Sequence, residues 1–158
     1  MTDGGPVREH YASEGITERV LTALRNANGP DVPITPETLA PIDHFHGKGV
    51  IATEELVAEL QPKASDNLLD IGCGIGGPAR WIAAKYGCRV TGVDLTAEFC
   101  AAARELNNLT GLADRVEILH GSALSTGRTR TQATSRKENL HIEDIASTPA
   151  GRDNGEQR

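Results

Sequence analysis

Glycines and carboxylates gather in one short stretch of the sequence. Positions 72, 74, 76 and 77 are glycine, and carboxylates stand at Asp70 and, further on, at Asp94. A glycine-rich turn lets the backbone bend sharply and approach a ligand closely, and a helix that follows it adds the positive end of its dipole. A nearby carboxylate accepts hydrogen bonds from hydroxyl or ammonium groups. These residue types together predict a loop that binds a small molecule.

The glycine spacing fits two classes of cofactor. Gly72-x-Gly74-x-x-Gly77 matches the dinucleotide fingerprint, and Gly72-x-Gly74-x-Gly76 fits equally well, so spacing alone does not choose between them. Asp70 favours one class, because a carboxylate two residues before the first glycine repels a pyrophosphate. It suits a ligand that carries an ammonium and a sulfonium, as S-adenosylmethionine does. A fragment of a nicotinamide-dependent oxidoreductase is the alternative that Asp70 argues against.

The D-x-G-x-G-x-G pattern resembles the glycine-rich motif of class I, Rossmann-like S-adenosylmethionine-dependent methyltransferases. Upstream, Tyr11-Ala12-Ser13 and residues 43–49 look like the N-terminal lid segment of small-molecule methyltransferases of the sarcosine/dimethylglycine and ubiquinone-biosynthesis types. The resemblance implies methyl transfer to a small-molecule acceptor. It also implies that Tyr11 and His46 lie over the methyl donor as catalytic residues, with His44 as a further candidate for a general base. A solvated or capping loop residue is the alternative for each histidine.

The same resemblance implies a set of cofactor-binding residues: Asp70, Gly72, Cys73, Gly74, Gly76, Asp94, Leu95, Ser122 and Ala123. Asp94 ends a predicted strand, where this architecture places an acid for the ribose hydroxyls, although a helix N-terminal acid is the other interpretation. Leu95 would form an apolar floor for adenine. Ser122 stands where these enzymes usually carry an aspartate that accepts from the exocyclic amine.

The surrounding pattern predicts an α/β fold: N-terminal helices followed by the first half, about three parallel strands, of a Rossmann-like methyltransferase sheet. Strands are expected at 67–71, 89–94 and 115–120, and helices at about 15–27, 36–41, 50–60, 78–86 and 96–108. Pro78 opens the helix that Gly87 closes. The polar, glycine-containing start of the chain is expected to be loose until Tyr11. Phe99 is expected on the inner side of its helix, and Trp81 in the core.

Three regions follow from this pattern: a helical lid segment over 1–62, a partial S-adenosylmethionine-binding domain over 63–124, and a disordered tail over 125–158. The tail has few large apolar residues with which to offset its ordering entropy. The abrupt edge after Leu124 predicts a C-terminally truncated chain that is incomplete or inactive as it stands. The alternative is a non-catalytic cofactor-binding fragment that a partner completes. An exposed sheet edge would favour self-association.

Composition narrows the partners and the compartment. The formal net charge of −6 and a pI near 5.3 argue against a nucleic-acid partner held by phosphate contacts. Three cysteines without a C-x-x-C pair argue against a disulfide framework and against a metal site. Neither a signal peptide nor a long apolar run is evident, so we expect a cytoplasmic protein with no membrane partner.

Overall fold

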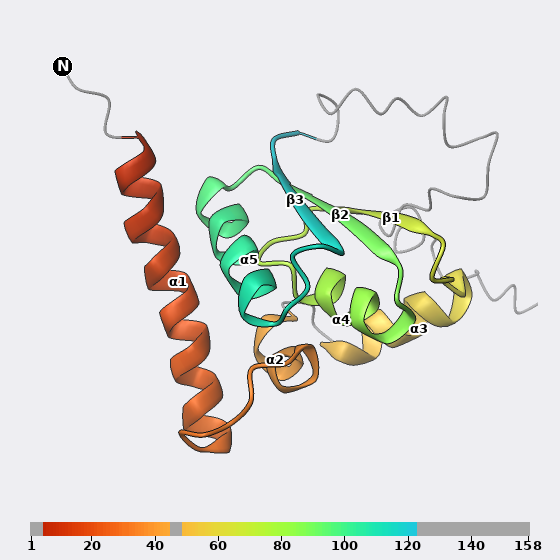
Figure 1. The fold of residues 1–158 in the computed structure, drawn as a ribbon, viewed down its shortest axis with the longest axis horizontal. Coiled ribbons are helices and arrows are strands. Elements are labelled where there is room, and N and C mark those ends of the chain that lie inside the picture. The colour runs from red at the N-terminus through yellow and green to blue at the C-terminus, as the bar shows by residue number, and fades with distance from the viewer. Residues whose placement is uncertain (1–4, 45–48, 123–158) are drawn as a thin grey trace, which may run out of the picture.

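The computed structural model describes residues 5–44 and 49–122, with side chains described from residue 15 onward. Figure 1 shows the succession of elements in these residues. They are α1 (Gly5–Asn28), α2 (Pro36–Asp43), α3 (Val50–Leu60), β1 (Asn67–Ile71), α4 (Gly77–Tyr86), β2 (Arg89–Asp94), α5 (Ala97–Leu109) and β3 (Val116–His120). The α/β class and the order of elements predicted from the sequence are confirmed. The predicted tail over 125–158 lies outside the described residues.

The three strands form one parallel sheet in the order β1-β2-β3. Asn67 of β1 pairs with Arg89 of β2, and Asp94 at the end of β2 pairs with His120 at the end of β3. Helices α4 and α5 are the crossovers that parallel strands require. The carboxyl ends of all three strands therefore meet at one edge of the sheet, where ligands bind in open α/β folds.

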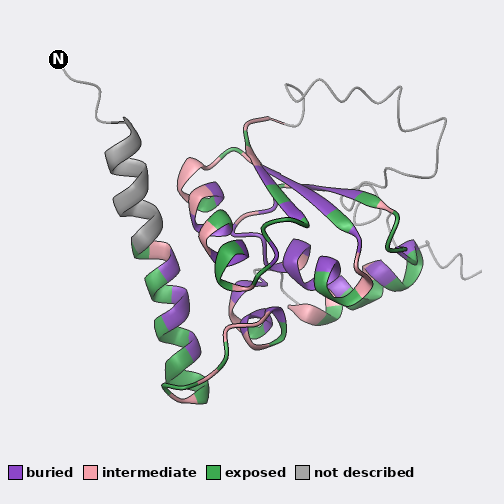
Figure 2. Cartoon of the chain, in the orientation of Figure 1, coloured by how far each residue is buried: buried purple, intermediate pink, exposed green. Residues whose placement is uncertain are grey.

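The helices pack in two groups around this sheet. Helices α4 and α5 lie against the strands, α1 runs along α5, and α2 lies against α4 (Figure 1). Figure 2 shows the buried residues on the inward sides of these elements. One apolar cluster joins the sheet to α3, α4 and α5, and includes Leu68, Ile82, Val90, Cys100 and Ile118. A second joins α1, α2 and α5, and includes Leu24, Leu39 and Leu106. Trp81 is buried, as predicted.

Glycine and proline set the ends of α4, the helix that follows the glycine-rich loop. Gly76 is its N-cap in the left-handed conformation (φ 78°), and Pro78 stands in the first turn, where its missing N–H costs nothing. Gly87 ends the helix, also left-handed (φ 72°), and its N–H donates to the Ala83 carbonyl oxygen. These two ends fix α4 directly behind the loop.

Three predictions about the helices are wrong. Helix α1 begins at Gly5, well before residue 15. The segment lacks the apolar period on which the prediction relied, but good helix formers follow Pro6. Helix α2 continues past Pro41 to Asp43. The hydrogen bond that Pro41 omits would reach the carbonyl of Glu37, and both residues are exposed, so water can satisfy that carbonyl.

The third correction concerns Phe99 in α5. Phe99 is 39% exposed, whereas its neighbour Cys100 is fully buried and takes the inward position. The Cys100 thiol lies against the ends of β2 and β3, donating weakly to the carbonyl oxygens of Asp94 (3.5 Å) and Leu119 (3.7 Å). These contacts fix the rotation of α5 at its start and direct Phe99 outward. Ala102, Ala103 and Leu106 are buried as predicted.

Candidate functional site

The loop between β1 and α4, residues 72–76, carries the glycines of the motif. Four of its N–H groups donate within the protein: Gly72 and Cys73 to the Val93 carbonyl oxygen (2.7 and 3.2 Å), Gly74 to Asp94 Oδ2 (2.8 Å) and Gly76 to the Cys73 carbonyl oxygen (2.8 Å). A pyrophosphate site needs N–H groups that are free to face the phosphate. These four N–H groups are therefore not free to face a phosphate, and the loop suits a cationic ligand better than a phosphate.

The outer side of the loop is open at Gly74. A Cβ built on Gly74 meets no other atom within 4 Å, and the residue has a left-handed φ of 54°. The backbone can thus approach a ligand at this point without a side chain between them. This opening is the structural feature that fits a small cofactor lying along the loop.

Asp94 forms one flank of the loop, which we call the β2 flank. Its Oδ2 accepts from the Gly74 N–H, and its Oδ1 accepts from the Thr96 N–H at 2.8 Å, just before α5 begins. Thr96 itself makes no side-chain cap, so Asp94 caps the helix start instead. A carboxylate offers about four lone-pair sites, so this partly exposed group can still accept from two hydroxyls. Both interpretations of Asp94 are compatible with the geometry.

The inner side of the loop carries negative charge. Asp70, next to last in β1, is buried at 7% exposure. Burial raises the pKa of the Cys73 thiol far above its ordinary value, and the charges of Asp70 and Asp94 raise it further. Both carboxylates therefore act electrostatically on the loop. The Cys73 side chain is buried against β2, so only its backbone is placed to serve a ligand.

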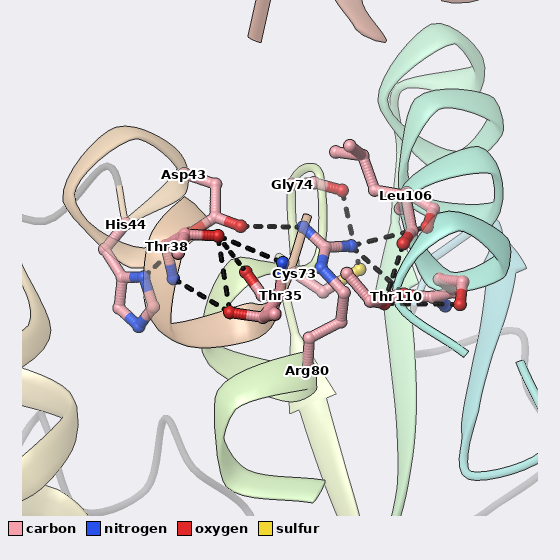
Figure 3. A network of polar contacts seen from close by, with 11 residues as sticks. Thr35, Thr38, Asp43, His44, Cys73, Gly74, Arg80, Leu106 and Thr110 are labelled. Atoms are coloured by element: carbon pink, nitrogen blue, oxygen red, sulfur yellow. Dashed lines mark hydrogen bonds and ion pairs between the residues drawn. The ribbon is translucent and has the colours of Figure 1, made fainter. Parts of the chain in front are cut away.

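The other flank of the loop, which we call the α2 flank, is built on Asp43 and Arg80. Arg80 of α4 is fully buried, and its Nη2 donates to Asp43 Oδ2 at 2.9 Å (Figure 3). Its Nη1 donates to Asn107 Oδ1 (3.0 Å) and to the Ala103 carbonyl oxygen (3.3 Å). Burial lowers the pKa of Arg80, and the charge of Asp43 and its hydrogen bond oppose that shift. The guanidinium thereby ties α2, α4 and α5 together.

Two glycines of the motif, Gly76 and Gly77, make room for the Asp43–Arg80 pair. A Cβ on Gly77 would lie 2.4 Å from the Asp43 carbonyl oxygen and 2.6 Å from its Oδ1. A Cβ on Gly76 would lie 3.1 Å from Arg80 Nη1. Gly77, the third glycine of the apparent dinucleotide fingerprint, is thus required by packing against Asp43. Its presence carries no information about which cofactor binds.

His44 continues the α2 flank. Its Nδ1 lies 2.9 Å from Asp43 Oδ1, and its side chain is 1% exposed. Its Nε2 is buried and has no hydrogen-bond partner among the described residues. An unpaired buried polar atom costs about 1–3 kcal/mol, which makes this nitrogen a candidate ligand contact.

The remaining predicted site residues fall at the same sheet edge or outside the described residues. Leu95 follows β2 and is 73% exposed, and its carbonyl oxygen lies 3.1 Å from His120 Nε2. Ser122 follows β3 and is half-buried, next to Gly121, whose N–H donates to the Asp94 carbonyl oxygen at 2.8 Å. Ala123 and His46 lie outside the described residues. Tyr11 is on α1, before the residues whose side chains are described.

Over residues 15–44 and 49–122, no three His, Cys, Asp or Glu side chains gather where they could hold a metal ion. No helix among the same residues is both long and apolar enough to cross a membrane.

The sequence indicates His44 as a candidate general base but misses the Asp43–Arg80 pair, because these two residues are far apart in the chain. One signal was present: Arg80 stands among Ala79, Ile82 and Ala83, all of which are fully buried on α4. A guanidinium on an apolar helix face needs a buried carboxylate partner. That requirement points to an acid in another element without saying which one.

The glycine-rich loop lies in the part of the chain that is similar to known proteins. Residues 68–142 match the family model of a methyltransferase domain. The chain is 42% identical over 81 residues to 24-methylenesterol C-methyltransferase 2 of Oryza sativa subsp. japonica, which covers 51% of this chain and 22% of that protein. It is 39% identical over 77 residues to methyltransferase GfsG of Streptomyces halstedii, covering 49% of this chain and 28% of that protein.

Solved structures support the same fold. The crystal structure of MccD protein superposes with a TM-score of 0.50 at 16% identity, over 54% of this chain and 37% of that one. The matched part of this chain spans less than a third of the length of either curated relative named above. The matches confirm the resemblance to class I, Rossmann-like S-adenosylmethionine-dependent methyltransferases for the region that carries the glycine loop and the sheet.

Proposed function

We propose that this chain binds S-adenosylmethionine along the loop between β1 and α4, and that it takes part in methyl transfer to a small-molecule acceptor. The observation that carries the proposal is the loop itself. It is open at Gly74, four of its N–H groups donate within the protein, and two carboxylates, Asp70 and Asp94, act on it. A cationic cofactor with a ribose fits these features, and the related methyltransferases support the choice.

Each residue at the sheet edge has a role in this proposal. Asp94 accepts from the ribose hydroxyls while it keeps the loop in place through Gly74. Asp70 attracts the ammonium and sulfonium charges. Leu95 is exposed and offers an apolar surface to the adenine, and Ser122 serves the adenine edge from the end of β3.

The bound cofactor supplies a methyl group on a sulfonium, which an acceptor atom can attack directly. The protein then contributes mainly alignment, which is worth roughly 7–11 kcal/mol of a barrier in well-oriented reactions. We assign residues 1–62 the role of a lid that excludes water. Tyr11 and His46 are proposed to lie over the methyl donor and to accept a proton from the acceptor.

Location and assembly are part of the same proposal. The three cysteines are buried free thiols, which suits a reducing cytoplasm. Within the described residues β1 and β3 are the two edges of the sheet, and an unpaired edge favours association with a second copy.

Calorimetric titration with S-adenosylmethionine and, in parallel, with NAD tests the cofactor. We expect the first to bind more tightly, since Asp70 attracts its charges and repels a pyrophosphate. Asp70→Asn removes that discrimination while keeping the size of the side chain, so it should narrow the difference between the two affinities. Equal or tighter binding of NAD by the unmodified chain contradicts the proposal.

A further inference from the structure

We propose that His44 Nε2 accepts a hydrogen bond from the α-ammonium group of the bound cofactor, and that Asp43 and Arg80 are positioning residues for this contact. The inference rests on the proposed function, because it assigns a residue to one end of that ligand. It starts from the buried group at the α2 flank, where Asp43 lies between His44 and Arg80 (Figure 3).

The pairing with Asp43 fixes which ring nitrogen of His44 carries the proton. Asp43 is ionised against the Arg80 guanidinium, with Oδ2 taking the 2.9 Å hydrogen bond from Nη2. An ionised carboxylate only accepts hydrogen bonds, so Nδ1 must be the donor across the 2.9 Å to Oδ1. In the neutral imidazole the lone pair then belongs to Nε2, which becomes an acceptor.

That acceptor is buried, and no group in the described part of the chain pairs with it. The His44 side chain is 1% exposed, and Nε2 makes no hydrogen bond to residues 15–44 or 49–122, although Nδ1 of the same ring is satisfied. Buried acceptors are nearly always paired, and an exception calls for an absent partner. A donor group of a ligand would supply the missing bond and remove the cost of leaving Nε2 unpaired.

The position of His44 selects the end of the cofactor. Ribose hydroxyls are assigned to Asp94, at the β2 flank, which holds the loop through the Gly74 N–H. His44 follows Asp43, which lies against Gly77 at the other end of the loop. A ligand that lies along the loop with its ribose at Asp94 extends its amino-acid portion toward the α2 flank.

The chemistry of the ammonium group agrees with this arrangement. An ammonium has three donors, so Asp70 and the His44 lone pair can both accept from it. Nε2 of His44 adds an acceptor without adding another negative charge at the flank, where Asp43 is paired with Arg80. A hydrogen bond to a charged group is among the stronger ones in proteins.

Two ligands that differ only in the amino-acid portion test the assignment. S-adenosylhomocysteine carries the ammonium, whereas 5′-methylthioadenosine lacks the amino-acid group and keeps the adenosine. In His44→Phe, which removes the acceptor, we expect calorimetry to show roughly tenfold to hundredfold weaker binding of S-adenosylhomocysteine. Binding of 5′-methylthioadenosine should not change. His44→Gln keeps an acceptor oxygen and should recover part of the lost affinity.

Asn107→Ala is the matched structural control. It removes a hydrogen bond from Arg80 on the side remote from Asp43, so it should lower thermal stability while leaving the ratio of the two dissociation constants unchanged. Equal losses for both ligands in His44→Phe, or no loss for either, would overturn the inference. If the unmodified chain binds neither ligand, the proposed function itself fails and the inference falls with it.

Nitrogen-15 NMR of the histidine rings checks the tautomer without any ligand. We expect the ring that disappears in His44→Phe to be protonated at Nδ1, and Asp43→Asn to shift it toward a mixture of tautomers. Protonation at Nε2 alone in the unmodified chain would also overturn the inference.

Discussion

The glycine loop has a carboxylate at each flank, and the protein holds the two in opposite ways. At the β2 flank, the Asp94 carboxylate is partly exposed and accepts from the backbone N–H groups of Gly74 and Thr96. At the α2 flank, the Asp43 side chain is 1% exposed and bonded to a fully buried guanidinium. The first carboxylate keeps lone pairs that a ligand can reach, whereas the second is committed to the framework.

One short glycine motif therefore serves two purposes. Gly74 faces open space, whereas a side chain on Gly77 would collide with Asp43. Gly74 therefore serves ligand binding, whereas Gly77 allows α2 to pack closely against α4. Changes at the α2 flank should therefore act mainly on stability, and changes at the β2 flank mainly on cofactor affinity. His44 is the proposed exception, because it is positioned by the Asp43–Arg80 pair and contacts the ligand itself.

The largest expected effect comes from removing the framework carboxylate. Asp43→Ala leaves the Arg80 guanidinium buried without its partner, and breaking a buried pair in this way costs about 3–5 kcal/mol. Urea unfolding should show this loss in the free energy of unfolding. That is a large share of the roughly 5–15 kcal/mol typical of a whole domain.

The double replacement Asp43→Leu with Arg80→Met is the control for that prediction. It removes both charges and keeps apolar volume, so it should be less destabilised than Asp43→Ala. If the double variant is as unstable as the single one, the cost lies in packing rather than in the unpaired charge, and the role assigned to the pair is wrong.

At the β2 flank the expected effect is on affinity. Asp94→Ala should weaken S-adenosylmethionine by about tenfold to hundredfold, or roughly 1.5–3 kcal/mol, because charged hydrogen bonds to the ribose are lost. Asp66 offers a matched control: its Oδ2 also accepts from a backbone N–H, that of Lys63 (2.8 Å), but it precedes β1 at the opposite edge of the sheet. Asp66→Ala should leave the affinity unchanged. Unchanged affinity in Asp94→Ala would leave Asp94 only its helix-start role.

How much of this site the sequence could predict differs between the flanks. Local patterns predict Asp94, the loop and the parallel strands. The signals for them, such as Pro78, Gly87 and the strand ends, each lie within a few residues of the feature that they predict. Asp43 and Arg80 are 37 positions apart, and their contact depends on how α2 packs on α4. Sequence periodicity says which face of a helix is buried, but not which buried group on another element will meet it.

The same limit explains the errors in the helices. Phe99 was assigned inward because it is apolar, yet the thiol of Cys100 contacts the ends of β2 and β3 and fixes the rotation of α5. The start of α1 was missed because the prediction required apolar periodicity, and helix propensity alone extends the helix to Gly5. Packing thus outweighs the apolar periodicity at Phe99, and helix propensity outweighs it at the start of α1.

A pair of glycine substitutions separates the two flanks more finely. Gly77→Ala places a Cβ 2.4 Å from the Asp43 carbonyl oxygen, and overpacking of this kind costs typically about 1–3 kcal/mol of stability. Gly74→Ala meets no atom, but it strains a left-handed residue by about 1–2 kcal/mol and projects a methyl group into the open side of the loop. For each variant, the loss of S-adenosylmethionine affinity from calorimetry is divided by the loss of unfolding free energy. This ratio should be larger for Gly74→Ala than for Gly77→Ala. A larger ratio for Gly77→Ala would contradict the division of roles between the two flanks.

The smallest expected effect is a pH dependence that belongs to the β2 flank. The pKa of the Cys73 thiol is raised by burial first and then by Asp70 and Asp94. Below about pH 8.5, the ordinary thiol value, both folded and unfolded chains keep the proton and its stabilising contribution is complete. Above it the unfolded chain loses the proton while the folded one retains it, so stability falls as pH rises.

Urea unfolding at about pH 7.5 and about pH 9.5 measures this contribution. Cys73→Ala should remove about 1.4 kcal/mol of the decrease between these two values, since a single thiol accounts for that much over one pH unit above its ordinary pKa. Asp94→Asn should bring the thiol's pKa down toward its ordinary value, because one of the charges that raises it is gone. An unchanged slope in Cys73→Ala would mean that the thiol is exposed to solvent, and that the loop does not close over β2 in the way that separates its two flanks.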